Sequence, residues 1–301
     1  MSAVPIAATA APGGQEAAAR GARQPRGRNS QLRAGWVTYA VLGVVTLISV
    51  FPLYYTLVLA TRTNAEINEV PPPLIPGGRL LQNIREAYTQ VDLTKAIVNS
   101  VIVSGSVALG TVLFCTLAGF AFAKLRFRFS SALLGLTIGT MMIPPSLGVI
   151  PLYQMMVRLG WVDQLQAVIL PTLVTAFGVF FMRQYLLHAM PTELLEAGWM
   201  DGASTFRIFL SIVLPIARPA MAVLGMLTFL QAWNDFFWPI LVLQADNPTV
   251  QVGLNNLGQG YVPDRSVILA GTFLTTIPVI VVFAALGRQI VGGIMHGAVK
   301  G

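Results

Sequence analysis

Few residues of this chain could do chemistry, and the densest group lies in residues 196–215, EAGWMDGASTFRIFLSIVLP, between two long apolar runs. Glu196, Asp201 and Arg207 are the charged residues there. Asp235 is the one acid placed well inside an apolar run. A single acid cannot form an aspartyl dyad, and the apolar runs hold no Ser/His pair and no H-E-x-x-H motif. The residues therefore argue against an intramembrane enzyme.

Metal and nucleotide chemistry are also poorly supported. Cys115 is the only cysteine, and His188 and His296 are the only histidines, too far apart in sequence to suggest a zinc site. No G-x-x-x-x-G-K-[ST] phosphate loop occurs. We expect no metal, no bound cofactor and no ATP hydrolysis by this chain.

The composition predicts an integral membrane protein. Of the 301 residues, 55% are hydrophobic and 10% are charged, against about 25% charged in ordinary soluble domains. Mean hydropathy is +0.70. The net charge is +7, but the basic residues are scattered and form no continuous stripe, so nucleic acid is not the expected partner.

The apolar runs predict an all-α, polytopic protein with six transmembrane helices, because a helical crossing needs about 20 apolar residues. The six runs cover roughly residues 36–60, 97–122, 131–152, 166–187, 219–243 and 267–293. Residues 1–35 are rich in Ala, Gly, Pro and Arg and are expected to be a disordered basic tail. The run that follows is too long for the apolar core of a signal peptide.

The positive-inside rule predicts the orientation. With six crossings, thirteen of the Lys and Arg residues fall on one side and six on the other. Both termini are therefore expected in the cytoplasm, in a multi-pass protein of the cell membrane. The same count places the loop at about 188–218 in the cytoplasm, where its charges would lie in water.

A helical wheel over this loop predicts two faces. One stripe would collect the apolar residues Leu195, Trp199, Phe206, Phe209 and Leu210, and the other face Glu196, Met200, Ser204 and Arg207. The loop could be an amphipathic connector on the membrane surface, or a docking surface for a protein. Surface helices are usually rich in Lys and Arg on the polar face, whereas this one is acidic, which favours docking.

The spacing of Glu196-Ala197, Gly202, Ile212 and Leu214-Pro215 resembles the cytoplasmic EAA loop of permease subunits in binding-protein-dependent ABC importers. Gly198 departs from the pattern, which usually has a second Ala there. The resemblance implies a coupling helix that docks on a separate ATPase subunit. The residues that it assigns to ATPase docking are Glu196, Ala197, Gly198, Asp201, Gly202 and Ala203.

The resemblance covers residues 36–301, taken as one transmembrane domain, and implies the type I ABC importer permease fold. MMIPPSLGVIPLY, AWNDFFWPILVL and GGIMHGAVKG are similar to stretches of the carbohydrate branch, in its shorter, six-span subunit of the maltose type. The resemblance implies a second, different permease subunit, two ATPase subunits and an extracellular sugar-binding (lipo)protein as partners.

The implied cargo is an oligosaccharide, and the likeness is nearest to actinobacterial permeases for cello-oligosaccharides, cellobiose or chitobiose. Another sugar or glycerol phosphate is the alternative. A secondary transporter or channel is a remote alternative, because it would need ionisable groups in several spans.

Two further regions carry site predictions. Pro144 and Pro145 remove backbone donors inside a run, which indicates either a simple kink or an unwound segment that lines a pathway. The second set, in the fifth run, is either pathway lining or an aromatic belt: Trp233, Asn234, Asp235 and Phe237.

The loop at about 244–266 is predicted to be external. By the resemblance it contacts the binding protein, and a plain solvated loop is the alternative. The residues assigned to this contact are Asn255, Asn256, Gly258 and Gly260.

Overall fold

The structure, a computed structural model, describes residues 35–244, 246–259 and 263–298. These residues are helical, with no strand among them. The first half of the chain forms α1 (Trp36–Ala60), α2 (Asn64–Ile67), α3 (Leu80–Gln90), α4 (Leu93–Lys124), α5 (Ser130–Thr140), η1 (Pro145–Gly148) and α6 (Val149–Leu159). The second half forms α7 (Gln166–Ile169), η2 (Leu170–Thr172), α8 (Ala176–Ala189), α9 (Glu193–Met200), α10 (Thr205–Ile208), η3 (Phe209–Val213), α11 (Leu214–Trp233), α12 (Phe237–Val242), α13 (Val250–Leu257) and α14 (Arg265–Ala298).

The chain divides into two units, residues 1–51 and 52–301. In the first unit, residues 36–51 form the start of α1, and their side chains are exposed. An apolar surface all around a helix is typical of a membrane span. The predicted tail falls almost wholly on residues 1–34, outside the described residues.

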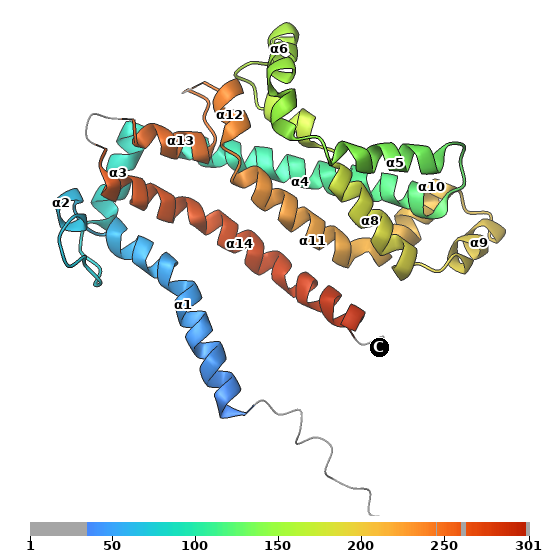
Figure 1. Ribbon diagram of the computed structural model, residues 1–301, viewed down its shortest axis with the longest axis horizontal. Helices are drawn as coiled ribbons and strands as arrows, with labels where there is room; N and C mark the ends of the chain where they lie inside the picture. The colour runs from blue at the N-terminus through green and yellow to red at the C-terminus, as the bar shows by residue number, and fades with distance from the viewer. Residues whose placement is uncertain (1–34, 245, 260–262, 299–301) are drawn as a thin grey trace, which may run out of the picture. The chain divides into compact units, whose positions relative to one another are not determined.

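The predicted all-α membrane fold is confirmed. Among the described residues, α1, α4, the continuous helix Thr205–Trp233 and α14 are long and apolar enough to cross a membrane. Two bent helix pairs bring the number of candidate crossings up to six. Figure 1 shows α4, α11 and α14 running alongside one another, and α4 and α11 both pack against α8.

Two predicted spans are not straight helices. The run at 131–152 is broken, since α5 ends at Thr140 and the pair 130–140 and 145–159 is bent by 92°. The run at 166–187 is also broken, with a bend of 43° between 166–172 and α8. Pro144 lies in the first break, and Pro171 lies just before the second. Proline weakens a helix because it lacks the N–H of a helical bond and disfavours helix in the preceding residue.

The predicted fifth span, residues 219–243, is wrong at both ends. Its helix is continuous from Thr205 to Trp233 and stops there, so Asp235 lies in a break before the short α12. Pro239 explains the break. A helix through this point would need an N–H at residue 239 to bond the carbonyl of Asp235, and proline has none.

Helices α4 and α8 pack very closely where glycines face the partner. A Cβ on Gly119 would lie 2.8 Å from the backbone N of Arg183 and 2.8 Å from the Cβ of Met182. A Cβ on Gly178 would lie 2.7 Å from the Sγ of Cys115. The two glycines therefore set the distance between these helices.

We predict that Gly119→Ala destabilises the protein by about 1–3 kcal/mol, since the added methyl group meets backbone that can move only with the whole helix. Thermal unfolding in detergent, followed by circular dichroism, measures the effect. Gly105→Ala is the matched control, because it lies in the same helix and its Cβ would meet nothing within 4 Å. Equal melting temperatures for the two variants would contradict the prediction.

Candidate functional site

Residues 193–208 form a helix, a turn and a second helix, not the single helix that the wheel assumed. Helix α9 ends at Met200, and α10 begins at Thr205. Gly202 between them has φ +74°, in the left-handed region. The backbone therefore reverses its course at Gly202, so one helical wheel cannot describe both sides of the turn.

The turn is a Schellman motif, in which the carbonyls at the end of α9 bond N–H groups beyond it. The N–H of Ala203 donates to the carbonyl of Gly198 at 2.9 Å, and the N–H of Gly202 donates to the carbonyl of Trp199 at 3.0 Å. Ser204 then caps α10, because its Oγ accepts from the N–H of Arg207 at 3.3 Å. Gly202 is thus required for the shape of the loop.

The predicted apolar stripe is only partly correct. Leu195 and Phe209 are buried, as predicted, and Ile208 is buried with them. Trp199, Phe206 and Leu210 are 43%, 66% and 49% exposed. The turn is the reason, since it rotates α10 relative to α9 and places different residues against the body of the protein.

The buried residues of this loop belong to one hydrophobic cluster with three long helices. It joins Met190, Leu195, Ile208 and Phe209 to Phe120 of α4, to Met182 and Leu186 of α8, and to Ala217 and Leu224 of α11. The rings of Phe120 and Phe209 lie 5.8 Å apart. The loop is consequently packed rigidly onto the helices.

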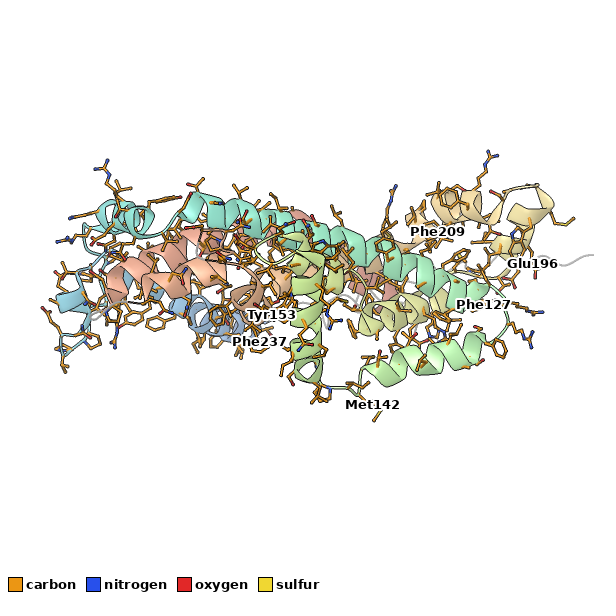
Figure 2. All side chains as sticks on the ribbon, turned by 90° about the horizontal axis from the view of Figure 1, so that it is seen from above. Phe127, Met142, Tyr153, Glu196, Phe209 and Phe237 are labelled. Carbon is orange, nitrogen blue, oxygen red and sulfur yellow. The ribbon has the colours of Figure 1, made fainter. Side chains whose placement is uncertain are left out.

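The six residues predicted to dock an ATPase lie together on α9 and the turn. Glu196, Ala197, Asp201 and Gly202 are exposed, and Ala203 is partly buried against the cluster. Gly198 is buried, and a Cβ there would lie 3.0 Å from Cδ1 of Ile208. At this position, where the EAA pattern has alanine, an added Cβ would require the buried side chain of Ile208 to shift. Figure 2 shows Glu196 at the same end of the protein as Phe127.

We predict that Gly202→Val weakens the loop, because a side chain in the left-handed region costs about 1–2 kcal/mol. Hydrogen–deuterium exchange of residues 193–208 should become faster in the full-length protein. Gly202→Asn is the matched comparison, since asparagine tolerates this conformation better. Equal exchange in both variants and the wild type would show that the left-handed turn is not needed.

The loop continues into the membrane helix through a π-helical segment, η3. Pro215 lies two residues after this segment and cannot donate the helical bond to the carbonyl of residue 211. The Oγ of Ser211 donates to the carbonyl of Arg207 at 2.6 Å, which helps to satisfy this widened turn. The helix is therefore continuous from Thr205, just after the turn, to Trp233, just before the interruption at Asp235.

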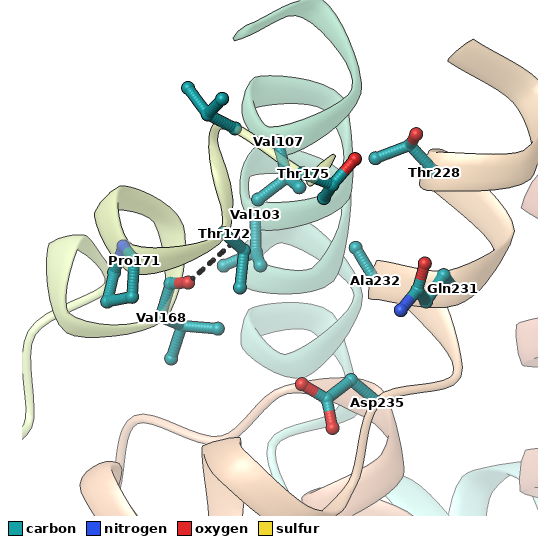
Figure 3. A pocket seen from close by; sticks show the side chains of 11 residues that line it. Val103, Val107, Val168, Pro171, Thr172, Thr175, Thr228, Gln231, Ala232 and Asp235 are labelled. Atoms are coloured by element: carbon teal, nitrogen blue, oxygen red, sulfur yellow. Dashed lines mark hydrogen bonds between the residues drawn. The ribbon is translucent and has the colours of Figure 1, made fainter. Parts of the chain in front are cut away.

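A cavity of about 470 Å³ lies among α4, the bend between η2 and α8, and the end of α11 (Figure 3). Its apolar walls include Val103, Val107 and Val168. Its polar lining consists of Thr172, Thr175, Thr228, Gln231 and Asp235, with no Lys, Arg or His among its described residues. Hydroxyl, amide and carboxyl groups beside apolar walls can bind a neutral, hydrogen-bonding solute.

Of the residues predicted for a pathway, the structure brings only Asp235 to this cavity. Trp233 is buried, stacks on Phe229 of the same helix at 5.7 Å, and joins α11 to α4 and α13 in one hydrophobic cluster. Asn234 donates to the carbonyl of Leu230 at 2.8 Å, and Phe237 is 56% exposed. Pro144 and Pro145 are exposed at the bend between α5 and η1.

Sequence reasoning missed Thr172, Thr175, Thr228 and Gln231. A signal was present, because Thr172 follows Pro171 directly and Thr175, Thr228 and Gln231 are polar residues in the middle of apolar runs. Threonine carries little information by itself, however, since its hydroxyl can bond its own helix, as that of Thr172 does to the carbonyl of Val168 at 3.0 Å.

The loop at 244–266 is not a plain solvated loop, because it contains α13. Val250, Val252, Gly253 and Leu257 of this helix are buried. The N–H of Val250 donates to the Oγ of Ser100 of α4 at 2.8 Å. Asn255, Asn256 and Gly258, predicted to contact a binding protein, are partly exposed at the end of α13, and Gly260 lies outside the described residues.

The fold and these sites define a polytopic membrane transport subunit with a packed loop at one end, and comparison with known proteins identifies its family. A family model described as the inner membrane component of binding-protein-dependent transport systems matches residues 112–294. The chain therefore belongs to this family of permeases, which are not enzymes themselves.

Two relatives are sugar permeases. The lactose transport system permease protein LacG of Rhizobium radiobacter is 32% identical over 265 residues, which cover 88% of this chain and 96% of LacG. The arabinooligosaccharides transport system permease protein AraQ of Halalkalibacterium halodurans is 32% identical over 270 residues, with the same coverage of 88% and 96%.

A third relative is the sn-glycerol-3-phosphate transport system permease protein UgpE of Escherichia coli, 30% identical over 268 residues, which cover 86% of this chain and 94% of UgpE. Among solved structures, one chain of a bacterial ABC transporter that imports the acidic polysaccharide alginate has the same fold. Its TM-score is 0.72 at 21% identity, over 84% of this chain and 95% of that one.

Proposed function

We propose that this chain is one permease subunit of an ATP-driven importer and that the turn at residues 193–204 docks an ATPase subunit. The observation that carries the proposal is that Glu196, Ala197, Asp201 and Gly202 are exposed on a loop whose other side is packed into the helices. A partner that moves this turn moves α4, α8 and α11 with it, because close-packed interiors transmit displacement.

The proposed complex contains a second, different permease subunit, two ATPase subunits and an extracellular binding protein. Family membership supports the binding protein and the ATPase. The excess of Lys and Arg on the side of the six predicted crossings that holds the turn supports a cytoplasmic location for it and for both termini. ATP and Mg²⁺ are assigned to the ATPase subunits, and the end of α13 to the contact with the binding protein.

We expect Glu196→Lys to reduce ATP-driven uptake by the reconstituted complex at least about tenfold. The substitution reverses a charge at the centre of the proposed docking surface, and like charges that face each other across an interface cost several kcal/mol. The amount of the variant in the membrane should not change, since Glu196 is exposed. Quantitative immunoblotting of membranes and uptake of labelled sugar measure the two quantities.

Glu69→Lys is the control for Glu196→Lys, because Glu69 is an exposed glutamate of the segment after α2, far along the chain from the turn. It should leave uptake unchanged. Normal uptake by Glu196→Lys would remove the proposed docking role.

The proposed cargo is a neutral sugar, and the lining of the 470 Å³ cavity supports it. Thr228, Gln231 and Asp235 can bond sugar hydroxyls, and the described lining holds no cation to bind a phosphate. LacG and AraQ favour a sugar, whereas UgpE favours glycerol phosphate. An oligosaccharide of the cellobiose or chitobiose type is the finer proposal, from the sequence resemblance.

We predict that Gln231→Ala raises the KM of uptake roughly 2- to 10-fold, which corresponds to one lost hydrogen bond of about 0.5–1.5 kcal/mol. Thr137→Val serves as control, since Thr137 is a threonine of α5 outside the cavity.

Asp235→Asn distinguishes the two classes of cargo. For a neutral sugar it should leave KM unchanged or raise it, whereas for a phosphate ester the loss of negative charge should lower KM. Uptake of labelled cellobiose and of labelled glycerol phosphate, compared in the same proteoliposomes, gives the result.

A further inference from the structure

A second cavity, of about 870 Å³, opens beside the docking turn. One wall is α9, with Thr192, Glu196 and Trp199, and the other is the end of α4 and the segment after it. That second wall consists of Ala121, Lys124, Leu125, Arg126 and Phe127. Two segments about 70 residues apart in sequence thus form one surface.

The second wall is held in place. Helix α4 ends at Lys124, and Leu125 is extended, with φ −96° and ψ 143°. Leu125 packs against the same hydrophobic cluster as the docking loop. The ring of Phe127 lies 5.6 Å from that of Phe122 on α4. Lys124 and Arg126 are therefore presented from a packed segment.

The charges of this cavity have no described partner within the chain. The ion pair found among the residues that the structure describes joins Arg62 to Glu66 at 3.4 Å between nitrogen and oxygen, and neither residue lines this cavity. The side chains of Lys124, Arg126 and Glu196 form no hydrogen bond with any residue that the structure describes. Arg128 differs, because its guanidinium lies over the ring of Phe129 at 4.8 Å and does not line the cavity.

We propose that Lys124 and Arg126 are a second half of the ATPase docking surface and bind carboxylates on the ATPase subunit, beside the turn at Glu196. The inference rests on the proposed function. The occupant is an acidic segment of the ATPase, because a partner seated on Glu196 and Trp199 covers the cavity that these residues share with the two cations. An anionic lipid surface fits less well, because it offers one sign of charge, whereas a protein segment can place carboxylates opposite Lys124 and Arg126 and a cation opposite Glu196.

The test uses the full chain in nanodiscs of neutral phosphatidylcholine and the purified ATPase subunit that copurifies with the wild type, identified by its phosphate-loop motif. The double variant Lys124→Glu/Arg126→Glu should weaken its binding at least about tenfold. Wild-type affinity should also fall more steeply with added NaCl than that of the double variant, because the variant has lost these ion pairs.

Arg128→Glu is the matched control and should bind the ATPase nearly as well as the wild type. If the charge-reversed protein is not monodisperse on gel filtration, Lys124→Gln/Arg126→Gln replaces it, with a smaller loss of affinity expected.

Unchanged affinity of the double variant overturns the inference, and so does an equal loss in Arg128→Glu, which would show a general effect of charge. A loss that appears only in nanodiscs with anionic phosphatidylglycerol would assign the cations to lipid instead. Glu196→Lys in the same assay separates the two proposals. If it loses binding while the double variant keeps it, the proposed function stands and the inference alone fails.

Discussion

Burial of Leu195, Ile208 and Phe209 among the side chains of α4, α8 and α11 attaches the loop at 193–208 to the membrane helices. Each such side chain contributes about 1.5–3 kcal/mol relative to exposure in water. A loop of this length with few apolar contacts would move independently of the membrane helices. Because these residues are packed, a displacement of the turn at Gly202 would be transmitted to the helices. The proposed coupling to an ATPase subunit requires such transmission.

Proline residues determine where several of the long apolar runs are interrupted. Pro144, Pro171 and Pro239 each stand at a break in a long apolar run. Backbone groups freed at such breaks are costly in lipid and are tolerated where protein or a cavity receives them. Two of these breaks border the 470 Å³ cavity, at the bend after Pro171 and at Asp235. The polar lining of the cavity therefore occurs where the helices are interrupted.

The two candidate regions differ in how far they could be predicted from the sequence. The residues proposed for docking lie close together in sequence, so the spacing from Glu196 to Gly202 was enough to predict that they share one loop, although Gly198 is buried there. The cavity is lined by three separate segments. Thr172 and Gln231 come together only through packing, and Trp233, a natural choice by residue type, is buried in a hydrophobic cluster with residues of α4 and α13.

The sequence by itself determined the membrane class, the approximate position of the spans and the family, because apolar runs and a local motif are properties of neighbouring residues. Tertiary structure decided which side chains face a cavity, where spans bend, and that residues 124–127 lie beside α9. Those outcomes depend on the meeting of distant segments and on backbone reversals such as the one at Gly202, which a periodic pattern along one helix does not contain.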